Sequence, residues 1–182
     1  MKLKQLSFFI LLCACGVGPL SGCGSTDEDS GSEGAAVVDM TVKDSLIRTG
    51  EKTVLALDFT YSSNAMSSEG ENVLVVIKLP PELAFEEGTS EIDGMFADRK
   101  VGAQFKACPK TDELFLVFDL DWSDLIGASN PDGDGDARLT LTLQGQRSVS
   151  VATIEGRAQS NFLSVSCDSP FEPDMHVQMS VL

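Results

Sequence analysis

The chain has 182 residues, of which 28 are acidic and 13 are basic, so its formal net charge at neutral pH is −15. An acidic surface of this size repels nucleic acids, and we therefore expect no nucleic-acid partner. Five cysteines and one histidine leave little material for a histidine-dependent catalytic triad or a four-ligand zinc site.

The chain begins with an export signal. Residues 1–4 form a short basic segment, and the apolar run of residues 6–12 is too short to span a bilayer. The signal ends in the tetrapeptide LSGC, residues 20–23, which resembles the bacterial lipobox, where a peptidase cuts before a lipid-bearing cysteine. The resemblance implies a signal peptide over residues 1–22 and a lipid anchor at Cys23, whose acyl chains, such as palmitate, hold the protein on the membrane.

The segment after the anchor is expected to be a tether. Residues 24–34 read GSTDEDSGSEG and contain no apolar side chain, so they cannot offset the entropy of an ordered chain. We expect residues 23–36 to connect the anchor to one folded domain, residues 37–182. In lipoproteins of two-membrane bacteria an aspartate after the lipidated cysteine favours the inner membrane, so Gly24 favours the outer membrane. The face of that membrane is left open.

Apolar residues in the body recur with period two, which is typical of strands with one buried face. This alternation is clearest in residues 53–61, residues 138–144 and Met175–Val181. Two segments are apolar on both faces and are expected to be central strands or strands covered on their outer side: Asn72–Leu79 and residues 114–120. Weaker candidates are residues 37–43, 101–107 and 148–158. About eight strands separated by turn-forming residues predict an all-β fold, an antiparallel immunoglobulin-like two-sheet sandwich.

The order of the motifs supports the same fold class. The chain reads GEKTVLALDFTYSSN, NVLVVIKLPPELAFEEGTS, LFLVFDLDWSDL, DARLTLTLQGQ and ATIEGRAQSN in turn. This order resembles the conserved-repeat, immunoglobulin-like domain of bacterial surface proteins, most closely in the LPPELAF segment of residues 79–85 and at residues 88–90. The resemblance covers residues 41–164 in patches and implies a non-catalytic, structural or adhesive role. The chain departs from the family in its final strand motif, residues 159–161, and in lacking an internal repeat.

Two cysteines remain in the expected domain, Cys108 and Cys167. An even pair in an exported chain favours a disulfide bond, which would close a loop of about 60 residues and contribute about 4 kcal/mol in the chain-entropy model. The alternative is a metal site with two thiolates, for which His176 is the one imidazole that the chain offers.

The stretch of residues 130–138, NPDGDGDAR, places oxygen-bearing side chains at alternate positions with glycines between them. Calcium takes six to eight oxygen ligands, and glycine permits the sharp turn that such a loop needs. An EF-hand is excluded because its twelfth position is Leu141, inside an expected strand. The candidate calcium ligands are Asn130, Asp132, Asp134 and Asp136. The alternative is a solvated acidic turn, and a bound ion would brace this connector without taking part in catalysis.

Motifs of catalysis are missing from the sequence: it has no G-x-S-x-G, no glycine-rich phosphate loop and no H-E-x-x-H, so we expect no enzyme. Tyr61 falls on the inward face of its strand. Trp122 is either an exposed contact or a plug at one end of the sandwich. We therefore expect an envelope lipoprotein that contacts another envelope protein or a glycan. The alternative is a carbohydrate- or ligand-binding module, with or without calcium.

Overall fold

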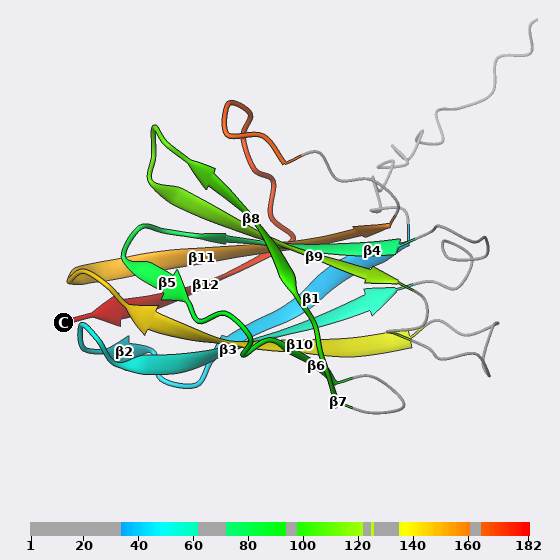
Figure 1. Ribbon diagram of the computed structural model, residues 1–182, viewed down its shortest axis with the longest axis horizontal. Helices are drawn as coiled ribbons and strands as arrows, with labels where there is room; N and C mark the ends of the chain where they lie inside the picture. The colour runs from blue at the N-terminus through cyan, green and yellow to red at the C-terminus, as the bar shows by residue number, and fades with distance from the viewer. Residues whose placement is uncertain (1–33, 62–71, 94–97, 122–124, 126–134, 161–164) are drawn as a thin grey trace, which may run out of the picture.

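The computed structural model describes residues 34–61, 72–93, 98–121, 125, 135–160 and 165–182. These residues form a sandwich of two six-stranded sheets whose strands run along the long axis (Figure 1). The first sheet, called sheet A here, has the order β1 (Ala35–Val42), β3 (Lys52–Tyr61), β10 (Gly135–Gly145), β6 (Glu91–Asp93), β7 (Asp98–Lys100), with β5 (Leu83–Phe85) also paired to β10. The second, sheet B, has the order β2 (Leu46–Ile47), β12 (Met175–Val181), β11 (Val149–Ser160), β4 (Asn72–Leu79), β9 (Glu113–Asp121), β8 (Ala103–Cys108).

The expected fold class, an immunoglobulin-like two-sheet sandwich, is confirmed. All eight expected strands are present, as β1, β3, β4, β8, β9, β10, β11 and β12. The short strands β2, β5, β6 and β7 come in addition. The pairings are antiparallel except that β2 lies parallel to β12. No helix in the described ranges is long and apolar enough to cross a membrane.

The main core lies between the sheets, because alternate residues of each strand point inward. From sheet A, the side chains of Leu57, Phe59 and Leu139 are fully shielded from solvent, and from sheet B so are Ile77 and Phe118. Each such side chain contributes about 2 kcal/mol on burial. Tyr61 is also buried and donates a hydrogen bond from its hydroxyl to the carbonyl oxygen of Leu125 at 3.3 Å. The expectation that Tyr61 points inward is therefore confirmed.

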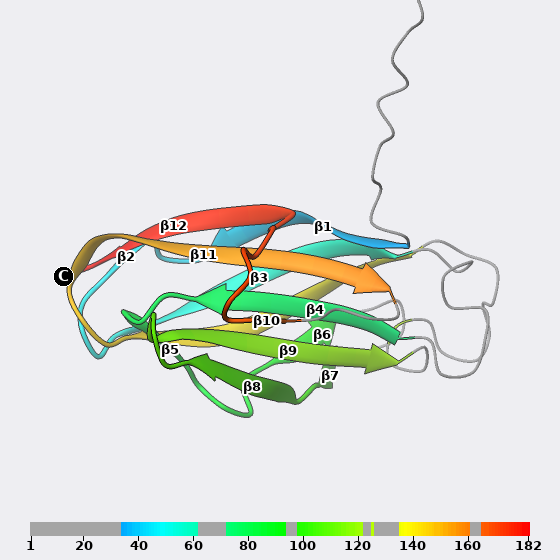
Figure 2. The same ribbon diagram turned by 90° about the horizontal axis from the view of Figure 1, so that it is seen from above.

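A second, smaller apolar cluster lies on the outer face of sheet B. Val76 of β4, Phe115 of β9 and Cys108 of β8 are buried there, although they point away from the main core. They are covered by residues 165–174, here called the strap, which include Phe171 (Figure 2). The strands that are apolar on both faces are thus both central in their sheet and covered on the outer side.

Candidate functional site

The LPPELAF segment, which carries the family resemblance, takes the chain from one sheet to the other. Strand β4 ends at Leu79 in sheet B, and β5 then pairs with β10 in sheet A. The turn between them is closed by a hydrogen bond from the amide of Leu83 to the carbonyl of Pro80 at 3.1 Å. Proline suits this turn because its fixed φ favours a bend and it requires no donor. The segment's role in the described structure is therefore to connect the two sheets.

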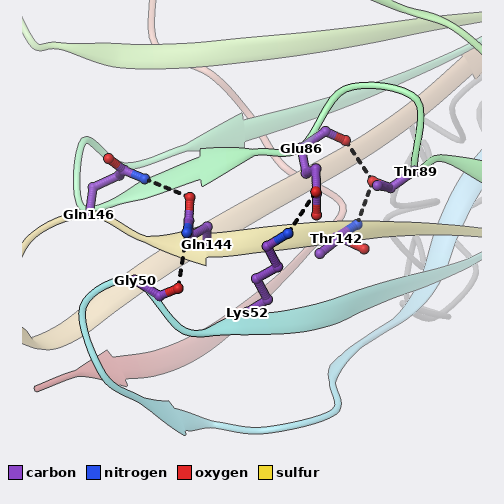
Figure 3. Close-up of polar contacts among 7 residues, drawn as sticks. All are labelled: Gly50, Lys52, Glu86, Thr89, Thr142, Gln144 and Gln146. Carbon is purple, nitrogen blue, oxygen red and sulfur yellow. Dashed lines mark hydrogen bonds and ion pairs between the residues drawn. The ribbon is translucent and has the colours of Figure 1, made fainter.

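The loop after β5 is tied to β10 by several polar contacts (Figure 3). The hydroxyl of Thr89 donates to the carbonyl of Glu86 at 2.6 Å and accepts from the amide of Thr142 at 3.0 Å. The amide of Glu86 donates to the carbonyl of Thr142, also at 3.0 Å. The ammonium of Lys52 lies 2.6 Å from the Glu86 carboxylate. Exposed ion pairs of this kind contribute about 0–1 kcal/mol, so the contacts with Thr142 do most to hold the loop.

A shallow, open pocket of about 150 Å³ lies beside this loop, where the loop approaches the start of β8. It is lined by Phe85, Glu87, Gly88, Val101, Ala103 and Phe105, among others. Sites for drug-sized ligands have volumes of about 300–1,000 Å³, so this pocket matches a single side chain better than a small molecule. At its wall the ring of Phe105, 49% exposed, stands 5.8 Å from that of Phe85, which in turn contacts Phe118 at 6.5 Å.

The strap is held by a disulfide bond between Cys108 and Cys167, whose Cα atoms are 5.5 Å apart. The predicted pairing is confirmed, and the two-thiolate metal site is excluded because both sulfurs are in the bond. Phe171 of the strap packs edge-to-face on Phe115 with ring centres 5.5 Å apart. The ammonium of Lys106 donates to the carbonyl of Val165. The strap is thus fastened to sheet B by one covalent bond, an aromatic contact and the hydrogen bond from Lys106.

The end of the strap also joins the two sheets. One carboxylate oxygen of Asp174 accepts hydrogen bonds from the amide of Val37 in β1 at 3.0 Å and from that of Ala158 in β11 at 2.9 Å. Val37 lies where the register of β1 against β3 shifts at a β-bulge. Bulged residues leave ladder donors unpaired, and a carboxylate satisfies such a donor well. Asp174 therefore fastens the edge of sheet A to sheet B.

The outer face of sheet A carries a row of charged residues. Arg138 of β10 stands opposite Asp58 of β3 and binds its carboxylate with two hydrogen bonds of 2.6 and 2.7 Å. The hydrogen bond from Arg138 lowers the pKa of Asp58 below its usual value and outweighs partial burial, which acts in the opposite direction. Asp39 and Asp93 continue the row on β1 and β6. Within this row, Arg138 and Asp58 form an ion pair between neighbouring strands.

On sheet B, Lys78 of β4 lies 3.0 Å from both Glu113 and Glu155, which belong to the neighbouring strands. Burial alone would lower the pKa of Lys78, but the two carboxylates outweigh burial and raise it. The three side chains form an ion-paired group on the outer face of the sheet.

Several candidate site residues lie outside the described residues, namely Cys23, Trp122, Asn130, Asp132 and Asp134. Asp136 belongs to β10, where its side chain is exposed opposite Thr60. Burial raises the pKa of Tyr61, and the negative charge of Asp136 adds to this effect. Within the described ranges no three histidine, cysteine or acidic side chains are grouped so as to hold a metal ion. Calcium binding by the acidic stretch therefore stays a prediction.

Three features were not singled out from the sequence: the pocket at Phe105, the bridging carboxylate of Asp174, and the cover formed by the strap. The strap could have been inferred from the two-faced apolar pattern of residues 114–120 together with the cysteine pair. Asp174 has no such signal, because its partners are main-chain amides far away in the sequence.

No protein-family model matches the chain, and no curated protein matches it. Among solved structures, the pilus backbone RrgB from Streptococcus pneumoniae is similar at 10% identity and a TM-score of 0.48, over 69% of this chain. A cohesin module of a family 33 glycoside hydrolase from Clostridium perfringens is 12% identical with a TM-score of 0.42, over 80% of this chain and 97% of the module. AvmM, which catalyzes macrocyclization in alchivemycin A biosynthesis, is 13% identical with a TM-score of 0.41, over 80% of this chain and 88% of AvmM.

This chain spans 32% of the length of RrgB. The three similar proteins include a pilus component, a cohesin module and a catalyst, at identities of 10–13% and TM-scores below 0.5. Similarity at this level gives no information about the activity of this chain. The sandwich fold is established by the strand pairing of the chain itself. The described chain is an all-β, two-sheet sandwich with a disulfide-fastened strap.

Proposed function

We propose that this chain is an envelope lipoprotein, anchored by acyl chains at Cys23, whose sandwich acts as a non-catalytic structural or adhesive domain. The observation that carries the proposal is the placement of the chain ends. Strand β1 starts at one end of the long axis, and the C-terminus lies at the opposite end in both views (Figures 1 and 2). An anchor that precedes β1 holds one end of the domain near the membrane and directs the other end away from it.

The titratable groups support a non-catalytic role. Catalytic acids and bases are expected to have shifted pKa values and to face a cleft. Among the described residues, the shifted groups are the ion-paired side chains of Asp58, Arg138 and Lys78 and the buried Tyr61. None of these four side chains lines the pocket beside Phe105. The shifts thus come from ion pairing and burial.

Lipid anchoring is tested with the Cys23→Ala variant. The wild-type protein should sediment with membranes and carry the mass of acyl chains on its first residue, whereas the variant should be released. A Cys108→Ala, Cys167→Ala double variant is the matched control, because it removes two cysteines and should stay on the membrane. A Cys23→Ala variant that is still fully membrane-bound would contradict the proposal.

The orientation of the domain is tested by fluorescence quenching from labelled lipid head groups. Single labels are placed at Val38, which is 51% exposed near the start of β1, and at the exposed Arg147 between β10 and β11. The label at position 38 should be quenched more strongly than the label at position 147. Equal quenching would show that the long axis does not point away from the membrane. It would remove the main support for the proposed structural or adhesive role.

A further inference from the structure

We infer that β8 is an open sheet edge at which an extended acidic segment of a partner protein pairs as a further strand of sheet B. In this arrangement, one apolar side chain of the partner enters the pocket beside Phe105, and a carboxylate on the other face of the added strand lies near Lys106. The inference rests on the proposed function only in that a non-catalytic domain acts through its contacts. It names the surface and the chemistry of the partner.

The first support is the geometry of the edge. Sheet B ends at β8, whose six residues pair with β9 in continuous register, so every second amide and carbonyl points away from the sheet. Natural proteins protect such edges by short strands, bulges, prolines and charged side chains, especially lysine. The other terminal strands in the described sheets follow this rule: β2 and β7 have two and three residues, and β1 carries the bulge at Val37. Strand β8 is longer than β2 and β7 and has no bulge, and its one charged side chain, Lys106, faces the outer side of the sheet.

The second support is the inner side of β8. Phe105 pairs with Leu116 of β9, points to the same side as the main core and is nevertheless 49% exposed at the wall of the pocket. A strand added at the usual spacing of about 4.8 Å places its side chain opposite Phe105 over this pocket. The volume of about 150 Å³ accommodates one branched or aromatic side chain. Strand addition of this kind takes affinity from main-chain bonds and specificity from pockets for alternate side chains.

The third support is the charge on the outer side of β8. Lys106 is the charged residue of β8, in a chain whose net charge is −15. Lys106 is exposed on this side, and in the described part of the chain its ammonium contacts a main-chain carbonyl and no carboxylate. Glu113 on the neighbouring strand β9 binds Lys78, and Asp168 of the strap binds Lys110. A carboxylate on the added strand would complete the pairing of Lys106.

The same charges decide between two occupants of the edge. Glu87 lines the pocket and repels a carboxylate there, so the partner residues facing the pocket are apolar and its acids face Lys106. A second copy of this chain paired through β8 would bring two Lys106 side chains close together, which is unfavourable. The net negative charge of the domain acts weakly at this edge, because charges more than about 8 Å apart are largely screened at physiological salt. An acidic partner is therefore favoured over a second copy.

The probe is a synthetic ten-residue peptide in which valine and phenylalanine alternate with glutamate. It is titrated into the mature full chain carrying Cys23→Ala, with calorimetry for affinity and amide hydrogen exchange for location. We expect binding with slowed exchange at the outward amides of β8. The same peptide with N-methylated main-chain amides cannot pair as a strand and should not bind. A peptide with lysine in place of glutamate should bind at least about five-fold more weakly.

Two variants of the chain test the two sides of the edge. Phe105→Ala removes the pocket wall and Lys106→Glu reverses the outer charge, and each should weaken peptide binding about five-fold or more. The matched controls are Val151→Ala, an equally exposed apolar residue of β11, and Lys43→Glu, an exposed lysine after β1. Both controls should bind the peptide as the unsubstituted chain does. Melting temperatures verify that every variant is folded.

Three results would overturn the inference: no binding at peptide concentrations of about 1 mM, equal binding of the N-methylated peptide, or concentration-dependent dimers with slowed exchange at β8. The last would assign the edge to a second copy. These results are distinct from a failure of the proposed function, because the titration uses the unanchored chain and the membrane tests do not involve β8. A chain that binds the peptide but is not lipidated would keep this inference and remove the anchor.

Discussion

The two sheets share one core but differ in what lies on their outer faces. In β10 of sheet A, Thr140 and Thr142 alternate with buried leucines and face outward without a cover. In sheet B, by contrast, Val76 and Phe115 point outward and are buried beneath the strap. The sequence reflects this difference as strict alternation in one case and a two-faced apolar run in the other. A strand that is apolar on both faces needs a cover, and here a distant segment supplies it.

The largest expected effect is the loss of the disulfide that fastens the cover. Relative to the Cys23→Ala chain, the added pair Cys108→Ala and Cys167→Ala should lower the free energy of unfolding by about 4 kcal/mol, because the bond closes a long loop of the unfolded chain. Urea denaturation measures this loss. The Cys23→Ala chain unfolded in reductant should match the triple variant, and a difference below about 1 kcal/mol between oxidised and reduced chains would contradict the expected role.

Two side-chain truncations, one in the strap over sheet B and one on the outer face of sheet A, test the contrast between the faces. Phe171→Ala removes the ring that packs on Phe115 and should cost about 2 kcal/mol, because that ring is only half-buried. Val54→Ala on the uncovered face of sheet A, where Val54 is 37% exposed, should cost less than about 0.5 kcal/mol. Both are measured by urea denaturation. Equal losses would mean that the strap covers sheet B without stabilising it.

A smaller effect is expected at the end of the strap. Asp174→Ala leaves the amides of Val37 and Ala158 without their acceptor. The substitution should lower the free energy of unfolding by about 1.5 kcal/mol. Hydrogen exchange at these two amides should become faster in the variant. Asp168→Ala is the matched control, because it removes a strap carboxylate that pairs with the exposed Lys110. The free energy of unfolding of this control should stay within about 0.5 kcal/mol of wild type.

The smallest effect concerns the uncovered face, where a stabilising contribution that is present at neutral pH is lost in acid. The pKa of Asp58 is lowered in the folded state by Arg138, so its contribution to stability is present above the unfolded-state value of 3.8 and is lost as pH falls through the folded value. The stability advantage of wild type over Asp58→Asn should therefore be constant near neutral pH and shrink below pH 4 or so. Arg138→Gln should likewise reduce the loss of the free energy of unfolding as the pH falls below about 4. If the stability of wild type and of the two variants changed with pH in parallel throughout the acid range, the stabilising ion pair of Asp58 and Arg138 would be refuted.

Much of the sandwich could be predicted because strand alternation is local. The position of Tyr61 in residues 53–61 predicts its inward side chain, and the even number of cysteines in the expected domain favours their disulfide bond. The short strands were missed: β5 and β6 have three residues each, too few to show a period. The start of β10 at Gly135 was missed as well, because Asp-Gly pairs suggest a turn while pairing with β3 extends the strand.

By itself the sequence determined the acidic character, the strand segments and their inward faces. These properties depend on residues that are neighbours or two positions apart. The tertiary structure alone decided the order of the strands, and with it that β8 ends a sheet, that Phe105 meets Phe85, and that Asp174 reaches both sheets. Such contacts join segments up to 137 residues apart. Local alternation carries no information about which distant strand becomes the neighbour, so the edges and covers of the sandwich follow only from the folded chain.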